Sequence, residues 1–415
     1  PVSEFRNTRR NFQTAGKDSR TKMTKASHFD HILLFVVVAL MGIGLIMVYS
    51  ASSVTSLATM SDGLYYFKRQ LIWVITGLLA ILVFSLVPYQ KLEKLAVPLL
   101  GLSVFLLILV LIPGVARDIG GARRWLRFGG IGFQPSEFAK ICFVIYVSHS
   151  ISIHQDRIRS FWHGLLPDLT IAAVVFSLIY KEPNLSTAAL ILGTYLVLYF
   201  LGNGSLAYLS ALGAIGISGI FVLIFQAGYR VRRLMAFLDP WENSRTSGYH
   251  IIQSLVAIGS GGFWGLGLGQ SRQKFFILPE RHTDFIFAII CEELGMIGGI
   301  VVLALFFALI WRGVYIATRA PDTFGFLLAS GITAIIGLQV VVNIGVVLSL
   351  MPTTGITLPF ISYGGSSLLF LAIGMGILLN ISRYGSARYA FEESRSTPFS
   401  GQFNDPLASG LTRRR

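Results

Sequence analysis

Charged residues are scarce in this sequence. Asp, Glu, Lys and Arg make up only 13% of the 415 residues, whereas 53% are hydrophobic and the mean hydropathy is +0.68. A chain with so few charges has more apolar surface than one water-soluble core can bury, which excludes an ordinary soluble domain. The composition therefore predicts an all-α, polytopic integral membrane protein.

Cysteine is also rare, and no nucleic-acid motif is present. Cys142 and Cys291 lie in separate apolar stretches and form no Cys-x-x-Cys pair, so we expect neither a disulfide nor a zinc site. The formal net charge of +14 would suit a nucleic-acid-binding protein, but short cytoplasmic loops of membrane proteins also collect basic residues. We therefore predict no nucleic-acid partner. The glycine-rich run at 259–269 lacks the Gly-Lys-Ser/Thr ending of a nucleotide loop, and we expect turns whose backbone is covered by protein.

Apolar stretches long enough to cross a bilayer recur along the chain. About 20 apolar residues are needed for one span. On this basis we predict about ten transmembrane helices, of which the fourth and fifth have the weakest pattern. They cover about 31–51, 69–88, 94–113, 136–153, 167–180, 185–202, 206–227, 284–311, 323–349 and 361–382.

The spans divide the chain into three parts. We predict a disordered basic cytoplasmic arm at 1–30, a membrane domain at 31–383 and a disordered cytoplasmic tail at 384–415. The arm carries seven Lys or Arg against three acids and lacks the apolar core of a signal peptide. An even number of spans places both termini on one side, and their basic residues indicate that this side is the cytoplasm.

Two connections, about 114–135 and 228–283, then fall on the outer face, the second being a large loop before the eighth span. Both are rich in basic residues, which the positive-inside rule disfavours there. Solvation or contact with lipid headgroups is one explanation. The other is an anionic, membrane-anchored ligand, because guanidinium groups such as those of Arg124 and Arg230 bind phosphate well.

Titratable residues crowd the start of the eighth span. Asp284 lies among them, and an ionisable residue at the mouth of a membrane helix is a functional hypothesis by default. At its ordinary pKa of ~4, Asp284 would be ionised at neutral pH. Glu137 and Lys140 share one helix face, which predicts an ion pair that is either structural or part of the site. We expect Gln339 and Asn343 to hold helices together rather than to contact substrate.

Several ordered motifs give the chain a family resemblance. Together they span about 31–384, and the sequence resembles the SEDS family (shape, elongation, division and sporulation) of FtsW, RodA and SpoVE. The residues at 269–274 and 363–367 resemble the FtsW and SpoVE branch more closely than the elongation branch. The matching segments are 44–51, 124–125, 134–137 with Lys140, 229–230, 239–241, 267–271, 278–280, 282–288 and 361–367.

The resemblance implies a peptidoglycan glycosyltransferase that polymerises lipid II on the outer face of a bacterial cytoplasmic membrane, for cell division or sporulation. It implies a class B penicillin-binding protein, a transpeptidase, as partner, together with other division or sporulation membrane proteins. The family's essential aspartate falls on Asp284, which we expect to be the general base. The expected substrate-binding residues are Arg124, Trp125, Glu137, Lys140, Arg230, Lys274, His282 and Ser366.

The sequence is also compatible with a metal ion at the site and with two other functions. A divalent cation, Mg²⁺ or Mn²⁺, could share the stabilisation of the leaving pyrophosphate, although no clear ligand set is present in the sequence. A flippase for the lipid-linked precursor and a non-catalytic scaffold of the division complex are the alternative functions. The chain also departs from the family's usual Gln-Pro-Asp-Leu-Gly-Thr, because residues 182–187 read Glu-Pro-Asn-Leu-Ser-Thr. Glu182 could restore the charge that is missing at Asn184.

Overall fold

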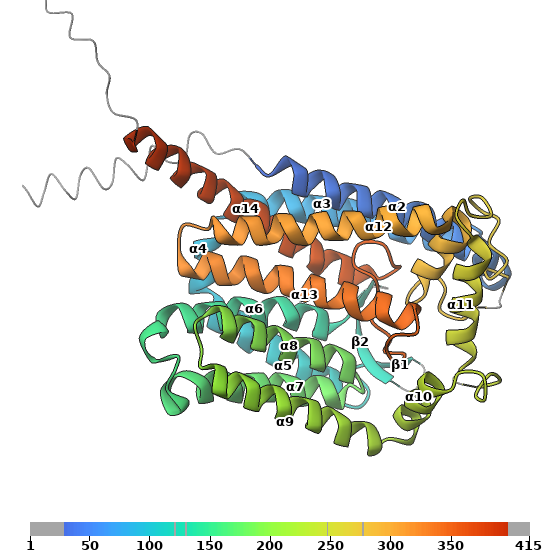
Figure 1. Ribbon diagram of the computed structural model, residues 1–415, viewed down its shortest axis with the longest axis horizontal. Coiled ribbons are helices and arrows are strands. Elements are labelled where there is room, and N and C mark those ends of the chain that lie inside the picture. The colour runs from blue at the N-terminus through green and yellow to red at the C-terminus, as the bar shows by residue number, and fades with distance from the viewer. Residues whose placement is uncertain (1–28, 120–121, 129–130, 247, 276–277, 397–415) are drawn as a thin grey trace, which may run out of the picture.

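The computed structural model describes residues 29–119, 122–128, 131–246, 248–275 and 278–396 (Figure 1). Nearly all of the expected basic arm and the end of the expected tail lie outside these residues. The last helix continues to Ser396, so the boundary expected at 383 falls inside a helix.

Long helices run side by side along the longest axis of the molecule (Figure 1). The strands, α10 and α11 lie at one end, and α4 lies at the other. The helices are α2 (His31–Met60), α3 (Tyr65–Leu86), α4 (Tyr89–Lys94), α5 (Ala96–Leu111), α6 (Pro135–Ile153), η1 (Gln155–Arg157), η2 (Phe161–Leu165), α7 (Leu166–Lys181), α8 (Leu185–Leu201), α9 (Leu206–Phe225), α10 (Gly228–Leu238), α11 (Tyr249–Gly261), α12 (Ile286–Thr318), α13 (Thr323–Val347) and α14 (Gly365–Ser396).

The prediction of a helical membrane protein is confirmed. Within the described residues, seven helices are long and apolar enough to cross a membrane, namely α2, α3, η2 with α7, α9, α12, α13 and α14. The helices α5 and α8 are apolar but shorter. Each of the ten stretches expected to span the membrane coincides with a helix. Nine of these helices are those just named, and the tenth is α6. The count of ten spans stays a prediction. None of the residues of α9 is buried although the helix is apolar throughout, as is expected of a surface that faces lipid.

A small sheet that the sequence did not reveal lies in the 114–135 connection. Its strands β1 (Arg117–Ile119), β2 (Ala122–Phe128) and β3 (Ile131–Phe133) pair antiparallel in the order β1-β2-β3. Leu126 pairs with Phe133. Three short strands carry too little alternation of polar and apolar residues to be recognised beside so many long apolar stretches.

The glycine-rich loop after α11 packs into a break in α12. Gly295 has φ 69° and ψ −169°, which interrupts the helix. The freed carbonyls of Glu292 and Glu293 accept hydrogen bonds from Leu266 N and Gly267 N, both at 3.0 Å. The expectation that protein covers this backbone is therefore confirmed.

The carboxylates of Glu292 and Glu293 hold the same loop and are fully buried. Glu293 accepts hydrogen bonds from Ser50 Oγ at 2.6 Å and from Gly269 N at 3.0 Å. Glu292 accepts one from Arg272 N at 2.8 Å. Both carboxylates thus belong to a buried polar network that stabilises α12 and the loop that precedes it.

We expect Gly295→Ala to lower the thermal unfolding temperature of the detergent-solubilised protein. An added Cβ would lie 2.4 Å from Gly265 N and from Phe263 O, and the positive φ adds strain. Together these should cost at least the ~1–3 kcal/mol of one strained residue. Gly101→Ala is the matched control, because nothing lies within 4 Å of its Cβ. Equal unfolding temperatures for the two variants would contradict this role of Gly295.

Candidate active site

Asp284 lies where three cavities meet. The polar cavity, of about 350 Å³, is lined by Trp73, Trp125, Glu137, Gln339, Ser367 and others. The arginine cavity, of about 830 Å³, is lined by Arg124, Arg230, Arg233, Ile220, Leu234 and others. A small cavity of about 180 Å³ is lined by His250 and Asn343 among others. Of the residues that the structure describes, Glu280, Asp284 and Gly355 alone border all three cavities.

Asp284 sits on an irregular segment that precedes α12, and side chains from two other elements fix its backbone. Asn343 Nδ2 on α13 donates to Asp284 O at 2.8 Å and to Ile356 O at 2.7 Å. Ser362 Oγ donates to Thr283 O at 2.6 Å. Asn343 therefore joins segments on both sides of the cavity, as expected of a residue that holds the structure together.

Gly355 has no side chain and therefore leaves space beside the Asp284 carboxylate. Its φ is +80°, and a Cβ there would lie 3.6 Å from Asp284 Oδ2. Any side chain at this position would strain the backbone and reduce the space in which a substrate hydroxyl could approach the carboxylate.

Burial, and to a lesser extent the negative charge of Glu280, raise the pKa of Asp284 from its usual range to about 7. The positive charges of Arg233 and Arg124 oppose this rise in the pKa. The expected pKa near 4 is therefore wrong, because it ignored desolvation of the carboxylate. A group that titrates near neutral pH is well suited to accept a proton in a reaction at that pH.

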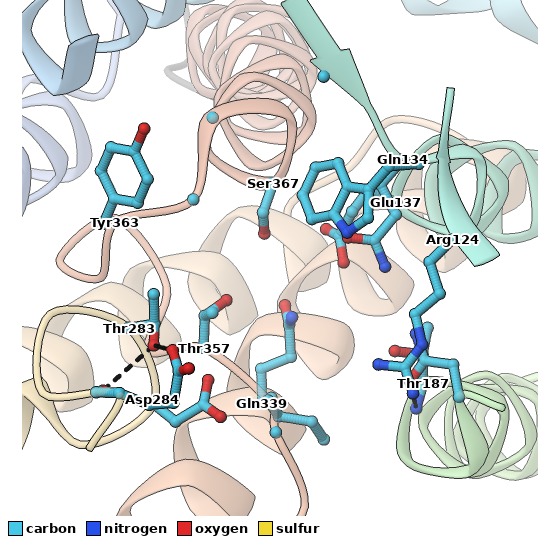
Figure 2. Close-up of a pocket in the computed structure, with 18 of the residues that line it drawn as sticks. Arg124, Gln134, Glu137, Thr187, Thr283, Asp284, Gln339, Thr357, Tyr363 and Ser367 are labelled. Atoms are coloured by element: carbon cyan, nitrogen blue, oxygen red, sulfur yellow. Dashed lines mark hydrogen bonds between the residues drawn. The ribbon is translucent and has the colours of Figure 1, made fainter. Parts of the chain in front are cut away.

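Strand β2 places Arg124 and Trp125 in the polar cavity, and Arg124 also borders the arginine cavity. Arg124 Nε donates to Glu182 O at 2.9 Å, and its Nη2 donates to Pro183 O. The guanidinium group is thus fixed between β2 and the connection from α7 to α8. Figure 2 shows Arg124 and Asp284 on different walls of the polar cavity.

Arg230, on α10, belongs to the arginine cavity. Its Nη1 donates to Tyr180 OH at 3.1 Å and to Leu223 O at 2.9 Å, and its Cζ lies 4.8 Å from the centre of the Tyr180 ring. Apolar residues of α9, including Ile220 and Ile224, line the same cavity. Cationic and apolar walls therefore face one space.

Glu137 and Lys140 form the expected ion pair. The Lys140 Nζ lies 2.9 Å from Glu137 Oε2, and both side chains are buried. Glu137 lines the polar cavity, whereas Lys140 lies behind it and balances its charge. The pair is costly to break, because a lone buried charge would remain.

Comparison with known proteins fits this arrangement. The family model for FtsW, RodA and SpoVE, described as a cell cycle protein, matches residues 31–387. The chain belongs to this family. Stage V sporulation protein E of Bacillus subtilis is 46% identical over 87% of this chain and 99% of its own length. The probable peptidoglycan glycosyltransferase FtsW of Trichlorobacter lovleyi is 44% identical over 87% of this chain and 95% of its own.

Two solved structures have the same fold. A chain from a peptidoglycan synthase complex, in a study of how polymerisation and crosslinking are coordinated, has a TM-score of 0.73 and 31% identity, covering 86% of this chain and 98% of its own. The rod shape determining protein RodA of Thermus thermophilus has a TM-score of 0.64 and 31% identity, covering 86% of this chain and 97% of its own.

Besides Lys140, three residues expected from the family motifs do not border these cavities within the described part of the chain. The Lys274 Nζ donates to Gly269 O in the glycine-rich loop. His282 packs on Tyr66, with ring centres 4.8 Å apart. Ser366 Oγ accepts a hydrogen bond from Gln134 N at 3.3 Å, while its neighbour Ser367 lines the polar cavity. In a run of two serines, the sequence alone did not show which one faces inward.

The structure adds residues that are not among the expected catalytic and substrate-binding residues. Arg69 and Trp73 of α3, Glu280, and Gln339 of α13 all line the polar cavity. Gln339, which we expected to hold helices together rather than to contact substrate, thus lies at the cavity. The charged pair Lys68-Arg69 at the start of an apolar span was a signal that could have pointed to this face of α3.

Glu182 does not restore the charge missing at Asn184. The carboxyl group of Glu182 is fully buried, and burial raises its pKa to about 8. It is therefore mainly neutral at pH 7. Asn184 accepts a hydrogen bond from Thr187 N at 3.3 Å and caps α8, and Ser186 Oγ donates to Thr354 O at 3.0 Å. Asn184 and Ser186, which differ from the family's usual residues, thus stabilise the wall between the two large cavities.

The described residues contain no cluster of three or more His, Cys, Asp or Glu arranged to hold a metal ion. Glu280 and Asp284 are the carboxylates that share the cavities, and Mg²⁺ usually needs further oxygen ligands, such as phosphate, beyond one or two carboxylates. These two carboxylates would need such further ligands to hold the ion.

We expect Glu280→Gln to lower the pKa of Asp284. Removing the negative charge of Glu280 favours the ionised carboxylate, so the titration midpoint should move from about 7 to lower pH. Infrared difference spectroscopy can follow the protonated carboxyl band, with Asp284→Asn used to assign it. The exposed Glu242→Gln serves as control and should leave the midpoint unchanged. A midpoint that stays or rises in Glu280→Gln would show that the charge of Glu280 does not act on Asp284.

Proposed function

We propose that this chain polymerises lipid II into peptidoglycan glycan strands on the outer face of the cytoplasmic membrane, for cell division or sporulation. One observation carries the proposal. A carboxylate whose pKa is about 7 lies at the junction of a polar cavity and an arginine-rich cavity. Relatives that match nearly the whole membrane region are named peptidoglycan glycosyltransferases.

The chemistry is a single displacement at the anomeric carbon of the donor sugar. Asp284 accepts the proton of the acceptor hydroxyl, whose oxygen forms the new bond to that carbon. The bond to the pyrophosphate oxygen breaks at the same time, and undecaprenyl pyrophosphate leaves with the electron pair. The anomeric configuration is inverted. Asp284 then releases its proton to solvent before the next cycle.

The arginine cavity suits the leaving group. Arg124, Arg230 and Arg233 place positive charge where the pyrophosphate gains negative charge, which lowers the barrier for departure. The apolar residues of α9 in the same wall suit the prenyl chain. A ligand with a charged head and an apolar tail fits a cavity with both kinds of wall.

The position of the cavities favours an enzyme over a flippase. All three border Asp284, at the end of the bundle that holds the strands, α10 and α11. The cavity at the opposite end is lined by other residues, including Asn203 and Asp322. A flippase needs a site near the midplane that opens to both sides.

The positions of the chain ends bear on the orientation of the protein in the membrane. Asp30, before α2, lies beside Arg312 and Ser382, away from the strands, so both described chain ends leave from the same end of the bundle. We place that end in the cytoplasm, where the basic termini belong.

A class B penicillin-binding protein and other division or sporulation proteins are the proposed partners. A structural relative comes from a peptidoglycan synthase complex, which supports a crosslinking partner.

We expect Asp284→Asn to express, insert and bind its penicillin-binding partner but to lose at least the ~10²-fold in polymerisation rate typical of removing a general base. The amide keeps the shape of the carboxylate but cannot take the proton. Glycan chains made from purified lipid II are the measurement. A well-folded variant that retains more than about a tenth of the parent rate would contradict the assignment of Asp284. A parent protein that makes no glycan, and instead only moves lipid II or recruits its partner, would support the alternative functions.

Arg230→Ala should raise the concentration of lipid II needed for half-maximal rate. Losing a charge-assisted hydrogen bond at a partly wet site costs roughly 1.5 to 3 kcal/mol, or about 10- to 150-fold. Arg232→Ala, two residues away on the same helix and not among the residues that line the arginine cavity, is the control. Unchanged kinetics at limiting lipid II would remove Arg230 from the site.

A further inference from the structure

The polar cavity contains buried polar atoms that no described residue satisfies. Gln339 is only 2% exposed, and its Oε1 has no hydrogen-bond partner among the described residues. Ser367 is half-buried, but its Oγ is buried and also has no hydrogen-bond partner among the described residues. Both residues line the polar cavity together with Asp284. Figure 2 shows their side chains pointing toward one another across this space, from α13 and α14.

Helix packing does not explain Gln339. Asn343, one turn later on the same helix, uses its amide to bind two backbone carbonyls of neighbouring segments. The Asn343 Oδ1, like the Gln339 Oε1, has no partner among the described residues, but the amide of Gln339 makes no donor contact of this kind there and lines the polar cavity. A buried polar atom without a partner costs about 1–3 kcal/mol. Such atoms in native proteins call for an explanation, and a bound ligand that supplies the partner is one.

The neighbouring residues indicate which chemical groups would bind. Gln339 and Ser367 are neutral and offer both donors and acceptors, which match hydroxyl and acetamido groups. Trp73 and Trp125 line the same cavity and provide apolar surface. The cavity volume of about 350 Å³ lies within the ~300–1,000 Å³ range of small-molecule sites. The pyrophosphate has its own cationic wall in the arginine cavity.

We propose that Gln339 and Ser367 form a saccharide-binding subsite that holds hydroxyl and acetamido groups of the precursor beside Asp284. The inference rests on the proposed function and specifies it further: recognition of the sugar is separated in space from recognition of the pyrophosphate. Both residues would position the sugar through neutral hydrogen bonds, while Asp284 takes the proton.

Two ligands that differ only in the sugar test the subsite. Lipid II carries both the saccharide and the lipid pyrophosphate, whereas undecaprenyl pyrophosphate lacks the saccharide. Dissociation constants for both would be measured with the full-length protein in lipid nanodiscs. Gln339→Leu and Ser367→Ala should each weaken binding of lipid II about 2- to 10-fold, the effect of losing a neutral hydrogen bond. Neither change should alter binding of undecaprenyl pyrophosphate.

Two comparison variants separate this effect from general damage. Thr333→Val removes a buried hydroxyl from the same helix α13, outside the cavities, and should change neither dissociation constant. Arg230→Ala should weaken binding of both ligands. Ser367→Ala tests the proposal independently if Gln339→Leu folds poorly, which the thermal unfolding temperature reports.

The possible outcomes are distinct. If the parent protein polymerises lipid II but neither Gln339→Leu nor Ser367→Ala changes its binding, the subsite is wrong while the proposed function stands. Equal weakening of both ligands would also overturn the subsite, because the effect would not depend on the sugar. A parent protein that binds lipid II but forms no glycan would instead refute the proposed function and leave saccharide recognition intact.

Discussion

The site depends on satisfying the backbone of two irregular segments inside a helical bundle. An unpaired backbone group away from water is costly, so non-helical chain at this depth requires partners from the protein. Asn343 supplies two hydrogen bonds that join Asp284 to Ile356, and Ser362 binds the neighbouring Thr283 O. Because these contacts fix the backbone on both sides of the cavities, the Asp284 carboxylate is held in place without using its own oxygen atoms. It therefore remains available to a substrate.

The charge state of this carboxylate follows from a balance of two effects. Burial and the nearby Glu280 disfavour the ionised form, whereas Arg233 and Arg124 favour it, and the result is a pKa of about 7. A carboxylate at its ordinary pKa of ~4 would be a weak base, and without the two arginines the pKa of Asp284 would be higher. The arginines thus act on both ends of the proposed reaction. They keep the base partly ionised, and they face the place where the leaving group gains charge.

The sequence predicted the helices well because long apolar stretches give a strong signal, and each expected span coincides with a helix. It also predicted that Asp284, Arg124 and Glu137 belong together, because family motifs mark them. It failed where the outcome depends on a short-range register or on tertiary burial. Ser366 and Ser367 differ only in which way each side chain turns from the start of α14. Gln339 and Asn343 look alike in the sequence, yet Gln339 lines the polar cavity, whereas Asn343 lies at the small cavity and binds two backbone carbonyls. The raised pKa of Asp284 likewise requires the surrounding atoms to be known.

The arginines are fixed by partners that leave their charge intact. Arg124 donates to the backbone carbonyls of Glu182 and Pro183, and Arg230 donates to tyrosine hydroxyls and a carbonyl. A carboxylate partner would fix a guanidinium group equally well, but it would also cancel the field that a pyrophosphate needs. Neutral oxygen atoms orient the group while its full positive charge remains directed at the cavity, so little reorganisation is needed when charge develops. Asn184 in the shared wall acts in the same direction. An amide caps α8 there without placing a negative charge next to Arg124, which leaves Glu280 and Asp284 as the acidic groups common to both large cavities.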